Sequence, residues 1–133
     1  MQRLRKLIKN SSGQAMVELA LVLPVLLLLV FGIVEFGRIF STQLLVTSSA
    51  REAVREAVVG AGDGAVVLCA KNSAAILDGT KMVVQITPDE YSRSRGNPVT
   101  VHIDYPVKIY APIISGIIGD PFVVSGEVTM RVE

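Results

Sequence analysis

The chain has 133 residues, half of them hydrophobic, with 13 basic and 12 acidic side chains and a single cysteine, Cys69. One cysteine excludes an internal disulfide. Four basic residues stand in the first ten positions, which leaves nine basic against twelve acidic residues and a net charge of about −3 for the rest, with no basic face of the kind that binds nucleic acid. We therefore expect no nucleic-acid partner. These four residues are Arg3, Arg5, Lys6 and Lys9.

An apolar run follows this basic leader. Ala15 to Val34 reads AMVELALVLPVLLLLVFGIV, with one charge, and its 20 residues at about 1.5 Å each match a hydrocarbon core of about 30 Å. The positive-inside rule keeps the basic N-terminus in the cytoplasm, so the chain after about Phe36 lies outside. Secretory signal peptides share this layout, but their apolar region is shorter and ends in a small-x-small site that VEFGRIFS lacks. We predict a single-pass protein of the cytoplasmic (inner) membrane.

The one charge in the run is Glu18. A charge near the bilayer centre costs about 2.5 to 3.5 kcal/mol on insertion scales, and an acid nearer the interface costs less. A glutamate that reaches headgroups and water is the simple interpretation. The functional one is that Glu18 stands five residues after Gly13, which is the spacing that prepilin peptidases act upon.

The segment GQAMVELALVLPVLLLLVFGIVEFGRIF, with the later SSAREAVREA, resembles the N-terminal region of TadE-like proteins. These are minor pilins or pseudopilins of the tight adherence (Tad or Flp) pilus, which is similar to type IV pili. The resemblance covers about residues 11 to 58. It implies cleavage by prepilin peptidase between Gly13 and Gln14, and a role in pilus assembly with other pilin subunits and the assembly platform, adhesion being the role of the whole system. Leu19 departs from the aromatic residue that many such substrates carry after the glutamate.

Cleavage would make Glu18 the fifth residue of the mature chain. The resemblance implies that its carboxylate pairs with the N-terminal amine of Gln14 on a neighbouring subunit. A paired charge is far less costly in an apolar assembly than two lone charges. Loss of the basic leader would also release the helix for extraction into an extracellular filament. An N-terminal glutamine can cyclise, which would remove the positive charge.

Two further features of the long helix have alternative interpretations. Pro24 removes one backbone hydrogen bond, and it indicates either a simple kink or a local softening that lets helices pack or stretch. Glu35 and Arg38, three residues apart at the outer interface, can pair across one helical turn or contact another subunit.

The helical pattern continues beyond the membrane. Apolar residues at spacings of about four, seven and eleven form one stripe: Val46, Ala50, Ala53 or Val54, and Ala57 or Val58. Three glycines, Gly60, Gly62 and Gly64, are predicted to end the helix. We therefore expect a leader at 1–13, a helix at 14–59 with a span at 15–34 and an amphipathic stalk at 38–59, and a small extracytoplasmic head at 60–133.

The head is predicted to be α+β. Ala65–Leu77 indicates a short helix, although residues 66–68 could form a strand. Lys81–Thr87, Pro98–Val107 and Phe122–Val132 are rich in β-branched residues and indicate an antiparallel sheet of about three strands. One face of the middle strand is apolar, and the end of the long helix is its natural cover. That face consists of Val99, Val101, Ile103 and Tyr105.

Two loops separate these strands. Pro88–Asn97, with Arg93 and Arg95, is predicted to be a solvated hairpin connection. Tyr110–Pro121 is apolar and rich in glycine and proline, and its isoleucines either fill the core or form an exposed patch that contacts another protein. These are Ile113, Ile114, Ile117 and Ile118.

No residue pattern indicates catalysis. His102 beside Asp104 on a strand is not a catalytic or metal constellation, and we expect no cofactor. The function we predict is a minor pilin or pseudopilin subunit that contacts membrane lipid, prepilin peptidase and other pilus components. The alternative is an uncleaved, membrane-anchored binding module. An anchored enzyme has no residues to support it.

Overall fold

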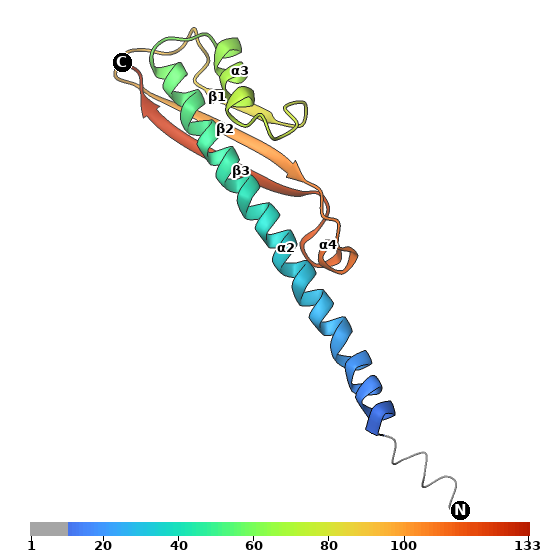
Figure 1. The fold of residues 1–133 in the computed structure, drawn as a ribbon. Coiled ribbons are helices and arrows are strands. Elements are labelled where there is room, and N and C mark those ends of the chain that lie inside the picture. Colours follow the sequence, from blue (N-terminus) through green and yellow to red (C-terminus); the bar gives the residue numbers. More distant parts are fainter. Residues whose placement is uncertain (1–10) are drawn as a thin grey trace, which may run out of the picture. The chain divides into compact units, whose positions relative to one another are not determined.

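The computed structural model describes residues 11–133, with side chains from Gly13 onward. The leader residues Arg3, Arg5, Lys6 and Lys9 lie outside the described residues. The chain divides into two compact units between Val34 and Glu35. The elements follow in the order α2 (Ser11–Val58), α3 (Asp63–Ser73), β1 (Val83–Thr87), β2 (Pro98–Val107), α4 (Pro112–Ile118) and β3 (Phe122–Arg131) (Figure 1).

The first unit consists of the apolar part of α2. Its large hydrophobic side chains are 43% (Leu23) to 74% (Met16) exposed, so they are not packed as a globular core. Among the described residues, α2 is the one helix that is long and apolar enough to cross a membrane. This supports anchoring of the chain in a membrane.

The second unit, residues 35–133, contains a three-stranded antiparallel sheet with the order β1-β2-β3. In the middle of the sheet, Val101 of β2 pairs with Ile86 of β1 and Val128 of β3. The predicted α+β fold is therefore confirmed. Strand β1 begins two residues later than predicted and β3 ends one residue earlier, while β2 has the predicted bounds.

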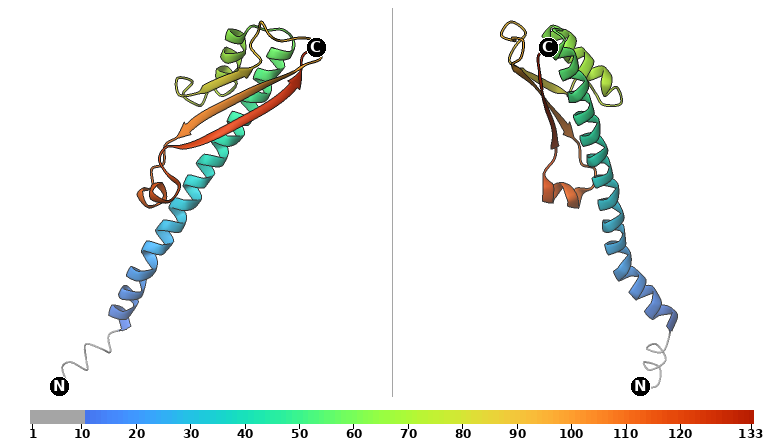
Figure 2. Two further views of the ribbon diagram at one scale, coloured as in Figure 1. Left: turned by 180° about the vertical axis from the view of Figure 1, so that it is seen from behind. Right: turned by 90° about the vertical axis from the view of Figure 1, so that its left-hand side faces the viewer.

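The second part of α2 covers one face of this sheet (Figure 2). The predicted apolar stripe is buried against the predicted face of β2, where Val99, Val101 and Ile103 have no exposed surface. Tyr105 on the same face is half-buried. The six residues of the predicted stripe, Val46, Ala50, Ala53, Val54, Ala57 and Val58, are fully or almost fully buried, and so is Ile39, two turns earlier.

Helix and sheet approach each other closely at Gly126. A Cβ at this position would lie 3.1 Å from the backbone of Val46 and Thr47. Beside it, the Gln43 side-chain amide donates a 2.6 Å hydrogen bond to the Ser125 carbonyl. A glycine in strand β3 thus permits the backbone of α2 to contact the sheet directly.

Helix α3 completes the core. Its Val66 and Ala70 are buried, and the Ser49 hydroxyl of α2 donates a 2.5 Å hydrogen bond to the Ala70 carbonyl. Residues 66–68 are helical, so the short-helix interpretation was correct, although the helix spans Asp63–Ser73 and not the predicted Ala65–Leu77. As predicted, α2 ends before Gly60, which has a left-handed φ of 91°. Gly64, however, lies inside α3 rather than in the linker.

The connection at residues 88–97 differs from the prediction. The side chain of Arg93 is only 5% exposed, forms an ion pair with Asp63, and donates a 2.8 Å hydrogen bond to the Ala61 carbonyl. Burial lowers the pKa of the Arg93 guanidinium. The Glu90 carboxylate also holds the start of α3, because it accepts a 2.6 Å hydrogen bond from the Asp63 N–H. The prediction of a solvated loop was wrong for Arg93, because Asp63 at the start of α3 gives its charge a partner; Arg95 is exposed.

The second connection, Tyr110–Pro121, is the apolar one and contains α4. Pro112 occupies its first turn, where a fixed φ and a missing N–H are tolerated, and Gly119 ends it with a φ of 85°. Ile114 is buried and Ile118 half-buried, while Ile113 and Ile117 are 59% and 78% exposed. One pair therefore contributes to the core and the other pair is exposed.

Candidate functional site

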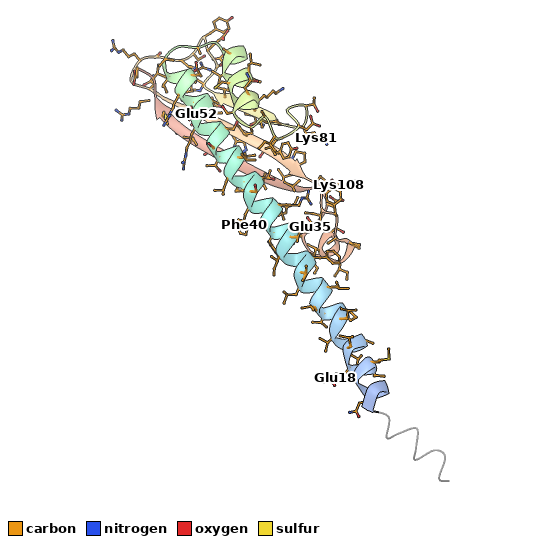
Figure 3. The ribbon with its side chains drawn as sticks, in the orientation of Figure 1. Glu18, Glu35, Phe40, Glu52, Lys81 and Lys108 are labelled. Atoms are coloured by element: carbon orange, nitrogen blue, oxygen red, sulfur yellow. The ribbon has the colours of Figure 1, made fainter. Side chains whose placement is uncertain are left out.

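The predicted processing residues lie near the start of α2, on the exposed apolar part of the helix. Gly13, Gln14 and Glu18 are helical and exposed, and Glu18 is labelled in Figure 3. Gln14 and Glu18 are four residues apart, which places them on the same face of the helix. A new amine at Gln14 would therefore stand about one turn from a carboxylate.

Pro24 lies inside α2, six residues after Glu18. Proline has no N–H, so the carbonyl of Ala20, four residues earlier, lacks its usual partner within the helix. The helix nevertheless continues through this position to Val58.

A second site lies in the head unit, where the helix holds a distant loop through one carboxylate (Figure 3). Glu35 is 4% exposed, and its Oε1 accepts hydrogen bonds from the backbone N–H groups of Tyr110 at 2.9 Å and Ala111 at 3.1 Å. Its Oε2 accepts from Nη1 of Arg38 at 2.8 Å. We call Glu35, Arg38 and the backbone of residues 108–111 the Glu35 clamp.

Arg38 is the second side chain of the clamp. Its Nη2 donates to the carbonyl of Lys108 at 3.3 Å, and its guanidinium lies 4.5 Å from the centroid of the Tyr110 ring. The ammonium of Lys108 lies 5.8 Å from the same ring. Both cations are close enough to the ring for a cation–π interaction, which adds to the hydrogen bonds.

The pairing of Glu35 with Arg38 across one turn was predicted, and its link to residues 108–111 was not. One signal in the sequence could have revealed this link. Glu35 stands four residues before Ile39 and eleven before Val46, so it lies on the buried stripe of α2. A carboxylate on a buried face needs hydrogen-bond donors, and exposed backbone N–H groups of a loop can supply them.

The outer face of the sheet is polar. His102 lies 3.1 Å from Asp104 and 3.2 Å from Glu127, and the hydroxyl of Ser125 donates to Asp104. The side chain of His102 is 31% exposed. Within residues 13–133, no group of three or more histidine, cysteine, aspartate or glutamate residues could hold a metal ion. His102 thus makes one contact along β2, with Asp104, and one across the strands, with Glu127 of β3.

These features define a class of protein: an apolar N-terminal helix that can anchor in a membrane, continuous with a small α+β head. A family model described as TadE-like protein matches residues 13–55, which include Gly13, Glu18, Pro24 and the pair Glu35 and Arg38. The resemblance to TadE-like proteins is therefore confirmed over this segment. This match is consistent with a protein of the Tad pilus system. The TadE-like family consists of pilus components and is not known for enzymatic activity. Neither the curated proteins nor the solved structures give a match.

Proposed function

We propose that this protein is a minor pilin or pseudopilin of a Tad (Flp) pilus. Prepilin peptidase cleaves it between Gly13 and Gln14, and it acts in pilus assembly, adhesion being the role of the system. The observation that carries the proposal is the spacing of Gly13 and Glu18 at the start of an exposed apolar helix, inside the segment that the TadE-like model matches.

Glu18 is the assembly residue of the proposal. After cleavage its carboxylate pairs with the amine of Gln14 on a neighbouring subunit, and the exposed apolar side chains around it pack against other subunits. Docking places both charges in apolar surroundings, where a partner offsets most of the desolvation cost. Pro24 lies in the same packed segment and softens it by one missing hydrogen bond.

The head supports a minor rather than a major role. Major Flp subunits, as a family, are much shorter than this chain and lack a folded head, whereas residues 35–133 form a compact unit here. In the proposal the N-terminus stays in the cytoplasm, the span lies in the cytoplasmic membrane and the head lies outside. The leader cations Arg3, Arg5, Lys6 and Lys9 hold this orientation until cleavage. The remaining partners are lipid, other pilins and the assembly platform.

Two substitutions separate processing from assembly. Replacing Gly13 by a bulky residue such as Leu is expected to block cleavage, which is followed by the electrophoretic mobility of the envelope protein. Glu18→Ala is expected to leave cleavage intact and to reduce recovery of the protein in sheared filaments. The matched control is Glu52→Ala, which removes an exposed acid from the same helix beyond the span.

Three outcomes decide the proposal. Cleaved Glu18→Ala chains that enter filaments at the wild-type level would refute the pairing of charges. A wild-type chain that stays uncleaved beside an active prepilin peptidase would favour the membrane-anchored binding module. Equal loss of assembly by the Glu52→Ala control would show that the helix as a whole, rather than Glu18, is sensitive to substitution.

A further inference from the structure

The head has an exposed apolar surface that its own core does not use. It consists of Tyr110, Ile113 and Ile117, which are 68%, 59% and 78% exposed. We call these three side chains the α4 surface. The segment between Asp104 and Asp120 has no acidic residue, and Lys108 is the one charged residue in it. Exposed clusters of large apolar side chains mark contacts with proteins or membranes.

The Glu35 clamp fixes where this surface lies. Glu35 follows Val34, the last residue of the predicted span, directly in the chain. Its carboxylate binds the N–H groups of Tyr110 and Ala111, and Pro112 begins α4 one residue later. Tyr110, the first residue of the α4 surface, is thus hydrogen-bonded to the residue that directly follows the apolar run.

The chemistry around the α4 surface is that of a membrane interface. Tyrosine has an apolar ring and a polar hydroxyl and is enriched at headgroup level, where lysine and arginine also extend their charged ends. Arg38 and Lys108 lie close to the Tyr110 ring and can face lipid phosphates while the isoleucines enter the boundary of the acyl chains. Phe36 and Phe40 of α2 are 50% and 65% exposed and carry apolar surface beyond the span, Phe40 on the side of α2 away from Glu35 (Figure 3).

We propose that the α4 surface docks on the lipid bilayer, in the headgroup region of the leaflet on the head's side. Ile114 and Ile118 fix α4 to the core from within, so that Ile113 and Ile117 present a rigid apolar edge to the lipid. The head is then held at the membrane by α4 as well as by its helix. The proposal rests on anchoring through residues 15–34 and is independent of cleavage at Gly13.

Site-directed spin labelling of the full-length chain tests the docking. In a Cys69→Ser background, Ile117→Cys is labelled in nanodiscs of phosphatidylcholine and phosphatidylglycerol that hold one copy each. The matched control is Val59→Cys, also an exposed apolar residue, because it follows Val58, the end of α2, which lies 23 helical residues or about 35 Å from Glu35. The label's collision rates with oxygen, which enters lipid, and with a water-soluble nickel chelate give its depth.

The label at residue 117 is expected to favour oxygen over nickel, as a label at Val22 in the span does, while the label at residue 59 favours nickel. A residue 117 label that resembles the residue 59 label would overturn the proposal. The measurement is repeated in nanodiscs that hold two copies of the chain. If the label at residue 117 is then shielded equally from oxygen and nickel, and its spectrum shows dipolar broadening, the α4 surface contacts a second copy and the lipid proposal is overturned. Because the nanodiscs contain no prepilin peptidase, failure here leaves the proposed processing untouched, and failed processing in cells leaves this result untouched.

Discussion

Removal of the Glu35 carboxylate is the sharpest test of how the head is fastened to α2. In Glu35→Ala the N–H groups of Tyr110 and Ala111 lose their acceptor, and Arg38 loses the partner that holds it at Lys108. Hydrogen bonds to a charged group contribute about 1.5 to 3 kcal/mol each, and water can partly replace them at this rim of the head. Arg38 is 39% exposed, so its share is small. We expect a loss of about 2 to 4 kcal/mol.

Two control variants make this measurement specific. Glu52→Ala breaks an ion pair with the same three-residue spacing, but its partner Arg55 lies 3.4 Å away and both side chains are exposed, so a change of at most about 0.5 kcal/mol is expected. Glu35→Gln keeps a carbonyl acceptor for the backbone N–H groups and is expected to fall between the two.

The assay combines guanidinium unfolding of the full-length chain in mild detergent with hydrogen–deuterium exchange. Exchange is expected to increase in residues 108–118 and to stay unchanged in β1, because the clamp holds the former segment alone. If Glu35→Ala and Glu52→Ala differ by less than about 0.5 kcal/mol, and residues 108–118 stay protected, the clamp does not stabilise the head.

Three other substitutions test the head. Gly126→Ala places a Cβ against the backbone of α2 and should cost about 1 to 3 kcal/mol of unfolding free energy; an unchanged denaturation midpoint would contradict the close contact. Asp63→Ala leaves the buried charge of Arg93 without its carboxylate and should cost about 1 to 3 kcal/mol, and wild-type stability would show the pair to be dispensable. The Thr80 hydroxyl and N–H donate to Asp78 and lower its pKa. Thr80→Ala removes the hydroxyl and should raise that pKa in a carbon-13 NMR titration, whereas an identical curve would exclude the hydrogen bond from the hydroxyl. Because that pKa is lowered, any stability from the bond is present at neutral pH and disappears as acid protonates Asp78.

Elements whose side chains repeat regularly could be predicted from the sequence. Alternation placed Val99, Val101 and Ile103 on one face of β2, and spacings of four and seven placed Val46 and Ala50 on the buried stripe of α2. In both cases each residue's place follows from its near neighbours in the chain. The sheet, the helix that covers it and the α+β fold were therefore predictable.

Features that depend on distant partners could not be predicted in the same way. In the sequence Arg93 is one cation of a polar loop, and its partner Asp63 lies thirty residues away. Glu35 is one half of a helical ion pair, and its partner Tyr110 lies 75 residues away. Helix α4 is seven residues long, with no charged first or last turn to announce it, and Pro112 and Gly119 alone mark its ends. Of the candidate site, the sequence predicted the Glu35–Arg38 ion pair but not the clamp.

Processing is read from the mass of the protein's N-terminal peptide, after isolation from membranes that contain an active prepilin peptidase. The chain is expected to begin at Gln14, and its mass distinguishes a cyclised or methylated form. Glu18 is then the fifth residue. A chain in the same membranes that still begins at Met1 would contradict the claim that this protein is a processed pilus subunit.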